Sequence, residues 1–220
     1  MDDFPEGEFL LPLFPLPNLV FFPKTRLPLH VFEPRYRQLV SDAMASEQRM
    51  GVVLLKPGWE SEYYRAPAIH ELGTLGLIEQ AVSLNDGRFN ILLRGVVRFR
   101  VVEPVGSVPY RIARVVAVPE VAAKPEEAYA HREWLVELSR RYLELLPGQM
   151  EVPELDTANL DALTNALVMS LNLEMEEKQQ LLELDRLADR CERVGELLKK
   201  RLEDLQFLAP YRREGDPDKN

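Results

Sequence analysis

The residues best able to do chemistry in this chain are three histidines, and their spacing decides which chemistry they support. His30, His70 and His131 are far apart, and none has a histidine, cysteine or acidic partner at the spacing typical of metal ligands. His70-Glu71 begins like a zinc-protease helix, but the second histidine of H-E-x-x-H is missing. We therefore interpret each histidine as a structural or surface residue.

Cys191 is the single cysteine and the one candidate thiol nucleophile. It falls within an apolar stripe at helical spacing, which predicts a small buried side chain. One cysteine excludes an intramolecular disulfide and is typical of a reducing compartment. The acidic pairs Glu126/Glu127 and Glu176/Glu177 come at expected helix beginnings, where the helix dipole favours negative charge, so they require no catalytic role.

The phosphate-binding and nucleophile motifs of common enzymes are missing from the sequence. There is no G-x-x-x-x-G-K-[ST] loop, no G-x-G-x-x-G after a strand, and no G-x-S-x-G elbow. We therefore expect no catalytic residues, no metal site and no cofactor, and neither ATP hydrolysis nor peptide cleavage.

An aromatic group in a loop is the strongest candidate for binding. Trp59, Tyr63 and Tyr64 lie among polar residues, between Pro57-Gly58 and Ala66-Pro67, where no helical or strand period is found. Exposed aromatic side chains give binding energy at little entropic cost. A binding role and a structural role both remain open for this group. Phe21 and Phe22, which are adjacent to each other in an earlier segment, are more typical of a core.

The first half of the chain has the patterns of strands. Pro12 and Pro15 within the first strand favour an edge or bulged position. Asn85-Asp86-Gly87 predicts a hairpin turn, Gly95 a bulge or bend in the return strand, and residues 104–109 a further turn. We expect one early helix at about 34–46, and strands at 9–16, 25–32, 50–55, 72–84, 88–102 and 110–118.

After Pro119 the apolar period becomes helical. A first helix follows His131 to Leu145 and is stopped by Pro147-Gly148. Asp156-Thr157 is the expected N-cap of a second helix. A third is expected to begin near Glu174, with one apolar stripe from Leu181 to Leu205. Strands early and helices late predict an α+β fold rather than a βαβ series.

Charge divides along the same boundary. The net charge is −9; residues 1–119 carry 13 basic and 13 acidic side chains, and residues 120–220 carry 14 and 23. An acidic chain lacks the general attraction that drives nucleic-acid binding, so a nucleic-acid partner is not favoured. No apolar run is long enough to span a membrane, and the acidic N-terminus is unlike a signal peptide. We expect a cytoplasmic protein without a membrane partner.

An ordered set of segments resembles the LON domain family. The set consists of residues 11–16 (LPLFPL), 20–23 (VFFP), 27–36 (LPLHVFEPRY), 73–76 (GTLG), the hairpin at 85–87, 94–99 (RGVVRF), 177–183 (EKQQLLE) and 185–187 (DRL). The resemblance extends over about residues 9–205. It implies a PUA-like β-barrel lobe followed by a helical bundle.

The resemblance also implies a function. In Lon proteases this region recognises unfolded or damaged proteins and precedes ATPase and Ser-Lys peptidase modules, of which the sequence contains neither. In cereblon a related domain belongs to a ubiquitin-ligase substrate receptor. We expect a free-standing, non-catalytic module that binds unfolded or specific polypeptides, as an adaptor to a protease or chaperone. The alternative is RNA binding through the barrel, using Arg94, Arg98, Arg100, Arg111 and Arg114.

The expected organisation follows. Residues 9–119 form the β-rich lobe, 120–208 the helical lobe and 209–220 a disordered tail. The barrel rim, the aromatic loop and the groove between lobes are the expected binding surfaces. The candidate partner-binding residues are Trp59, Tyr63 and Tyr64, with Arg35 from the signature segment.

Overall fold

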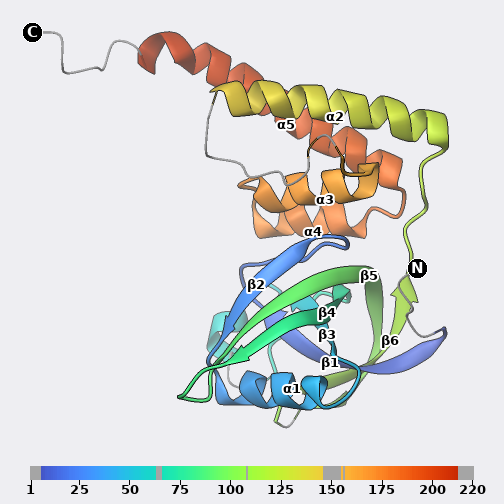
Figure 1. Cartoon of the computed structure of the whole chain (residues 1–220), viewed down its shortest axis with the longest axis vertical. Coiled ribbons are helices and arrows are strands. Elements are labelled where there is room, and N and C mark those ends of the chain that lie inside the picture. Colours follow the sequence, from blue (N-terminus) through green and yellow to red (C-terminus); the bar gives the residue numbers. More distant parts are fainter. Residues whose placement is uncertain (1–5, 63–65, 108, 146–154, 156, 213–220) are drawn as a thin grey trace, which may run out of the picture. The chain divides into compact units, whose positions relative to one another are not determined.

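The computed structural model describes residues 6–62, 66–107, 109–145, 155 and 157–212, and the chain forms two compact units (Figure 1). The first unit consists of Met1–Val121 with Asn172–Asp185, and the second of Ala122–Leu171 with Arg186–Asn220. The sequence analysis assigned 120–208 to one helical lobe. In the structure, the segment Asn172–Asp185 instead belongs to the unit that contains the strands.

The first unit is a β-barrel with added helices, as expected for an α+β fold. Its sheet has the order β2-β5-β4-β3-β1-β6, and β6 also pairs with β5, which closes the ring. The elements are β1 (Glu8–Leu16), β2 (Arg26–Val31), α1 (Pro34–Met44), β3 (Arg49–Leu54), the 3-10 helix η1 (Trp59–Glu62), β4 (Leu72–Ser83), β5 (Phe89–Gly106), β6 (Arg111–Val118) and α4 (Met175–Glu183).

The length of β5 makes closure possible. Its first part pairs with β2 up to Arg94, and its last part, from Arg98 to Gly106, pairs with β6. The alternating apolar residues of the strands then point into one core. That core contains Leu11, Leu13, Val53, Leu75, Val96, Val97, Phe99, Ala113 and Val115.

The bulge expected at Gly95 is confirmed. In the β4–β5 ladder Leu75 pairs with Val97 and Gly76 with Gly95, so Val96 is the extra residue. A Cβ on Gly95 would lie 2.3 Å from the carbonyl oxygen of Phe22. Glycine is therefore required here because another backbone segment passes against it.

β1 does not lie at the edge of the sheet, which was one of the two positions, edge or bulged, that its prolines favoured. Its residues Glu8–Leu13 pair with β6, and Leu13–Leu16 pair with β3. Each half of β1 is thus paired mainly along one side, which is the condition under which a strand tolerates proline. The turn expected at 104–109 begins later than predicted. β5 continues through Pro104 to Gly106, and two irregularities in its pairing with β6 absorb the proline.

The single third helix expected from Glu174 onward is wrong as well. It is divided into α4 (Met175–Glu183) and α5 (Leu187–Arg212), with Leu184 in an extended conformation between them. The leucines at 181, 184 and 187 keep a three-residue spacing across the break, so periodicity alone does not reveal it. The physical cause of the break is a contact with the barrel, described below.

The second unit consists of α2 (Pro125–Leu145), α3 (Leu160–Ser170) and α5, which pack on one another. α2 approaches α5 closely at Gly195, where an added Cβ would lie 2.1 Å from the Trp134 ring. Asn159 is the N-cap residue of α3, rather than the expected Asp156-Thr157. Cys191 is fully buried beside Thr164, 3.1 Å from its hydroxyl, which confirms the prediction of a core thiol.

Among the residues described, none of the helices is both long and apolar enough for a membrane span.

Candidate binding site

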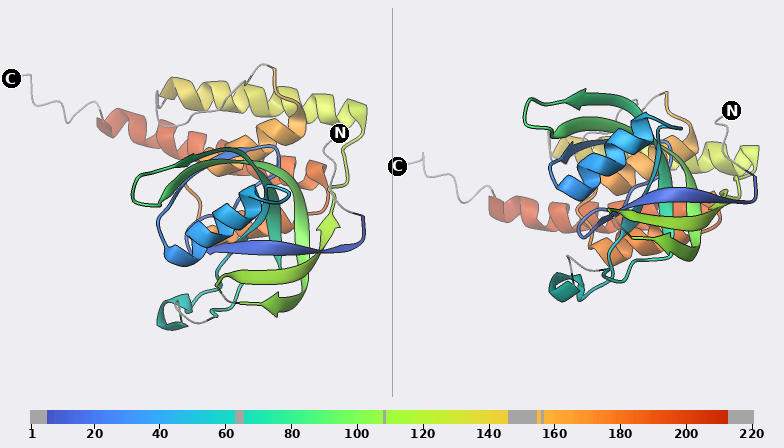
Figure 2. Two further views of the ribbon diagram at one scale, coloured as in Figure 1. Left: turned by 60° about the horizontal axis from the view of Figure 1, so that its bottom comes forward. Right: turned by 90° about the horizontal axis from the view of Figure 1, so that it is seen from below.

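Trp59 lies in η1, which stands out from the strands that follow and precede it (Figure 2). Its half-buried side chain lines a hollow of about 280 Å³. The hollow has an apolar floor and three carboxylates, and is lined by Pro17, Leu54, Leu55, Pro57, Trp59, Glu60, Glu174, Met175 and Glu176. Tyr63 and Tyr64, the other members of the aromatic group, lie outside the described residues.

Arg35 is in the first turn of α1, where Pro34 occupies a position that needs no N–H. Its guanidinium binds the carboxylate of Glu33 at 2.9 Å and lies 4.6 Å from the centre of the Tyr36 ring. The Tyr36 ring meets that of Phe14 edge-on at 4.4 Å, which fixes α1 against β1. Arg35 and Trp59, which were both predicted to bind a partner, line different hollows.

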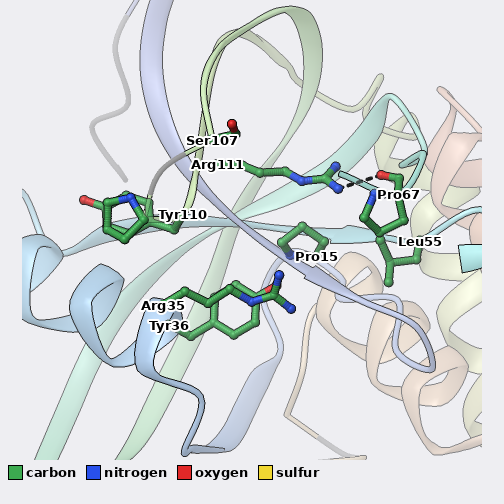
Figure 3. Close-up of a pocket in the computed structure, with 9 residues that line it drawn as sticks. Pro15, Arg35, Tyr36, Leu55, Pro67, Ser107, Tyr110 and Arg111 are labelled. Atoms are coloured by element: carbon green, nitrogen blue, oxygen red, sulfur yellow. Dashed lines mark hydrogen bonds between the residues drawn. The ribbon is translucent and has the colours of Figure 1, made fainter. Parts of the chain in front are cut away.

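The hollow at Arg35 is small, about 20 Å³, and has a second arginine in its wall (Figure 3). Arg111, the first residue of β6, donates a hydrogen bond of 2.6 Å to the carbonyl oxygen of Pro67. Burial lowers the pKa of the Arg111 guanidinium; Tyr36 raises it, and the positive charge of Arg35 lowers it. An arginine still keeps its charge at neutral pH, so the hollow has a basic wall.

Tyr110 closes another side of the small hollow. Its hydroxyl donates a hydrogen bond of 2.7 Å to a carboxylate oxygen of Asp42, from α1. Partial burial, followed by this hydrogen bond and the charge of Asp42, raises the pKa of Tyr110 to about 12. The pair joins the start of β6 to α1 on the exposed side of the barrel.

A third hollow, of about 300 Å³, opens at the mouth of the barrel beside Arg111. Its wall includes the core side chains Leu13 and Ala113, and its polar side chains are those of Ser107 and Arg111. The remaining lining residues are Ala66, Pro67, Ala68, Ile69, Val101, Pro104, Gly106 and Ile112.

The three hollows form a series, in which each shares at least one lining residue with the next. The Trp59 hollow and the small hollow share Leu55, and the small hollow and the barrel mouth share Pro67, Ser107 and Arg111. We call this series the rim hollows. Trp59 and Arg35 thus line different hollows that have the buried residue Leu55 in common. The sequence did not assign Arg111 to the rim hollows. Alternation along a strand predicts on which face of the sheet a side chain lies, but not which side chains it contacts.

The basic strip required by the RNA-binding alternative is broken up in the structure. Arg98 is fully buried, Arg94 binds Glu79 at 3.0 Å, and Arg114 binds Glu103 at 2.9 Å. Arg111 is in the rim hollows. Arg100, the fifth arginine, is exposed. Phosphate contacts need several available cations along one surface, and three of the five arginines are already buried or bound to carboxylates.

Arg98 has a structural role instead. It reaches from β5 to the end of α4, where its guanidinium donates to the carbonyl oxygens of Leu182 and Leu184, both at 2.9 Å. It also contacts the carbonyl of Pro119 at 3.4 Å and the carboxylate of Asp185 at 3.2 Å. The last carbonyls of a helix have no partner within it, so Arg98 both ends α4 and fixes it to the barrel.

The three histidines have different partners. His70 has two acidic neighbours in space that its sequence spacing did not indicate, Glu176 at 3.2 Å and Glu183 at 3.9 Å. His30 contacts Asn90, and His131 lies 3.6 Å from Glu192. Within the described part of the chain, no three histidine, cysteine or acidic side chains could together hold a metal ion.

A closed barrel bordered by hollows that apolar, aromatic and arginine side chains line has the form of a binding module. The family model described as the substrate-binding domain of ATP-dependent protease La (LON) matches residues 10–200. The chain therefore belongs to the LON substrate-binding domain family.

Individual relatives agree with this assignment. Lon protease 2 of Myxococcus xanthus is 32% identical over 213 residues, which are 94% of this chain and 25% of that protein. Lon protease of Anaeromyxobacter dehalogenans is 32% identical over 205 residues, 90% of this chain and 24% of that protein. The chain thus spans about a quarter of the length of the curated relatives it matches.

Solved structures agree as well. A Lon N-terminal domain protein from Xanthomonas campestris is 28% identical, with a TM-score of 0.61 over 84% of this chain and 96% of that one. The N-terminal domain of Mycobacterium avium complex Lon protease has a TM-score of 0.65 at 18% identity, over 87% of this chain and 98% of that one, and shows the likeness of fold.

Residues that carry the family resemblance prove to be mostly structural. The Thr74 hydroxyl donates to the Phe21 carbonyl at 2.6 Å, and Gly76 leaves room for the Phe21 ring. Gly95 lies against the Phe22 carbonyl, and Phe21 and Phe22 are buried, as expected. The resemblance thus identifies the barrel, whereas the rim hollows have to be found from the geometry.

Proposed function

We propose that the chain is a non-catalytic module that binds unfolded or flexible polypeptide segments at the rim hollows. The observation that carries the proposal is the series of hollows, since an extended segment needs successive sites for successive side chains. The family's substrates are those of a protease, and a protease acts on polypeptides. In its finer form, the proposal is an adaptor in the cytoplasm that presents bound polypeptides to a protease or chaperone.

The chemistry of the hollows suits a polypeptide. Apolar walls at the Trp59 hollow and at the barrel mouth accept side chains that a folded protein buries. The carboxylates of Glu60, Glu174 and Glu176 lie at one end of the series, and Arg111 lies toward the other. Such a surface binds apolar segments and uses charge to orient them.

The test is the capture of an unfolded protein by the whole chain. The probe is a fluorescein-labelled protein kept unfolded by reduction and alkylation of its cysteines, and binding is measured by fluorescence anisotropy. We expect Trp59→Ser to weaken binding by about tenfold, or roughly 1.4 kcal/mol, because Trp59 forms a wall of its hollow. The free energy of unfolding should change by less than about 1 kcal/mol.

The matched control is Tyr129→Ser, which removes an exposed aromatic side chain from α2 in the second unit. It should leave capture unchanged. Equal capture by Trp59→Ser and the unaltered chain would contradict the proposed site, and no capture by the unaltered chain would contradict the proposed function. A Tyr63→Ser/Tyr64→Ser variant tests the rest of the aromatic group, which stays a prediction from the sequence.

A further inference from the structure

Arg111 carries a positive charge that no described carboxylate neutralises. Its hydrogen-bond partner is the Pro67 carbonyl, and no acidic side chain of the described residues lies within ion-pair distance. Arg35, its neighbour in the small hollow, is already paired with Glu33. The small hollow therefore keeps about one uncompensated positive charge, on a half-buried side chain. An anion supplied from outside would be bound there by charge-assisted hydrogen bonds.

The dimensions of the small hollow limit what that anion can be. A volume of about 20 Å³ corresponds to one or two water positions, on the scale that gives about 10–15 Å³ for one. In Figure 3 the Arg111 and Arg35 side chains extend on either side of Pro15. A guanidinium presents several N–H groups in one plane, and Arg111 uses one nitrogen for Pro67. A carboxylate fits this space and geometry, whereas a large side chain does not.

The adjoining barrel mouth determines what the carboxylate is attached to. Its volume of about 300 Å³ and its apolar wall, formed by Leu13, Val101 and Ala113 among others, suit a large apolar side chain. Arg111, Pro67 and Ser107 border both hollows. A carboxylate in one hollow and an apolar side chain in the other therefore lie within one or two residues of each other in the bound chain.

We infer that the rim hollows recognise a carboxylate next to a large apolar residue in a polypeptide, with Arg111 binding the carboxylate and the barrel mouth the apolar side chain. This inference rests on the proposed polypeptide-binding function and names the feature that is read. The carboxylate has two possible sources, a free C-terminus after an apolar residue and an aspartate or glutamate beside one.

A polypeptide fits these hollows better than a nucleic acid. A bound RNA strand would place phosphates along several cations, but Arg94 and Arg114 are paired with glutamates and Arg98 is buried. The space next to Arg111 is lined mainly by apolar residues, among them Leu13 and Ala113 of the barrel core. One charge beside an apolar cavity matches a peptide carboxylate with its neighbouring side chain.

The experiment uses the whole chain and four fluorescein-labelled decapeptides rich in serine and glycine. Two end in leucine, one with a free carboxylate and one with an amide. The other two have amide ends and an internal Leu-Asp or Leu-Asn pair. We expect at least one carboxylate peptide to bind ten times more tightly than its neutral match, and the pair in which this occurs identifies the source. Equal affinities within both pairs would overturn the inference.

Substitutions assign the preference to Arg111. Arg111→Gln should abolish the difference within the preferred pair, while Arg111→Lys should keep part of it. The matched control, Arg114→Gln, removes an exposed arginine of the same strand and should leave the difference intact. Filling the mouth with Ala68→Trp, at an exposed lining residue, should weaken both members of the pair equally. Thermal unfolding of each variant verifies folding. A preference that survives Arg111→Gln would overturn the assignment.

Two further outcomes separate this inference from the proposed function. If the unfolded protein binds normally but neither carboxylate peptide competes with it, the inference fails and the proposed function stands. If neither the unfolded protein nor any peptide binds, both fail. An oligouridylate that displaces the carboxylate peptide as effectively as unlabelled peptide would also overturn the inference, in favour of RNA.

Discussion

The two ends of strand β6 differ in how an arginine is used. At the Val118 end, the neighbouring strand β5 contributes Arg98, which is fully buried and donates to carbonyls of Leu182, Leu184 and Pro119. At the other end, Arg111 is half-buried and donates to the carbonyl of Pro67. One end of the barrel is closed by α4 through an arginine, and the other is open beside one.

The surroundings of each guanidinium determine its role. Arg98 meets the unpaired carbonyls of a helix end, so both terminal nitrogens of its guanidinium donate to the chain itself. Arg111 donates to the Pro67 carbonyl, which belongs to a loop, and its side chain borders two hollows. Both residues are arginines on barrel strands, Arg98 within β5 and Arg111 at the start of β6. The packing around each one assigns the first to stability and the second to our proposed recognition.

The largest expected effect is at the closed end. Arg98→Ala leaves the carbonyls of Leu182 and Leu184 without their donor, and unpaired buried polar groups are costly. We expect a loss of about 3 kcal/mol or more in the free energy of unfolding, measured by urea denaturation. Hydrogen exchange of the α4 amides should rise more than that of β3. Capture of the unfolded protein should also weaken, because Glu174 and Met175 line the Trp59 hollow.

Arg114→Ala is the matched control for this prediction. Its ion pairs with Glu103 and Glu8 are exposed, and solvent-exposed pairs contribute little to stability. If Arg98→Ala lost no more than Arg114→Ala, the contacts of Arg98 would not be what holds α4, and the contrast between the two barrel ends would be lost.

Two glycines give a smaller test of the same contrast. Gly73, at the closed end, has the Val52 carbonyl oxygen 2.4 Å from where a Cβ would be, and Gly106, at the open end, has no atom within 4 Å. Gly73→Ala should cost about 2–3 kcal/mol, since a backbone atom cannot move aside easily. Gly106→Ala should change stability by less than about 0.5 kcal/mol. Similar losses for both, in parallel urea titrations, would mean that the open end is packed as tightly as the closed one.

Much of the fold could be predicted because, in the first half of the chain, local sequence patterns are enough to indicate the strands and turns. Alternating apolar residues predict the strands, and the hairpin at 85–87 and the bulge at Gly95 are where turn and backbone chemistry indicate. The break between α4 and α5 could not be predicted, because its cause is Arg98, more than eighty residues away in the sequence. The edge position predicted for β1 was not found, because a proline in the sequence does not show that each half of the strand pairs with a different neighbouring strand.

The candidate site could be predicted only in part, for a related reason. Trp59 could be proposed from the composition of its segment, since an aromatic residue in a polar loop is unusual in itself. Arg111 could not be proposed in this way, because its role depends on the side chains and hollows around it in the folded chain. Five arginines were candidates for one basic strip, and only the three-dimensional neighbours separate Arg94, which binds Glu79, and the buried Arg98 from Arg111.

The smallest expected effect is a change with pH at the open end. The pKa of Tyr110 is raised to about 12 from 10.0, first by partial burial and then by Asp42. The folded protein thus holds the phenolic proton more tightly than the unfolded chain does. Stability falls with pH wherever the folded state binds more protons, so this contribution is present below pH 10 and is lost as the pH rises toward about 12.

Tyr110→Phe isolates that contribution. Urea midpoints measured between pH 9 and about 12 should fall less steeply for the variant than for the unaltered chain, and the two chains should differ most at the low end of that range. Asp42→Asn should lower the Tyr110 pKa toward its ordinary value of 10.0, seen in the phenolate absorbance, because it removes the charge that favours the protonated phenol. Parallel midpoint curves would mean that the Tyr110–Asp42 contact is open to water in solution. The effect should be modest, since this pair lies on the exposed side of the barrel, where solvent screens charges that are shielded around Arg98.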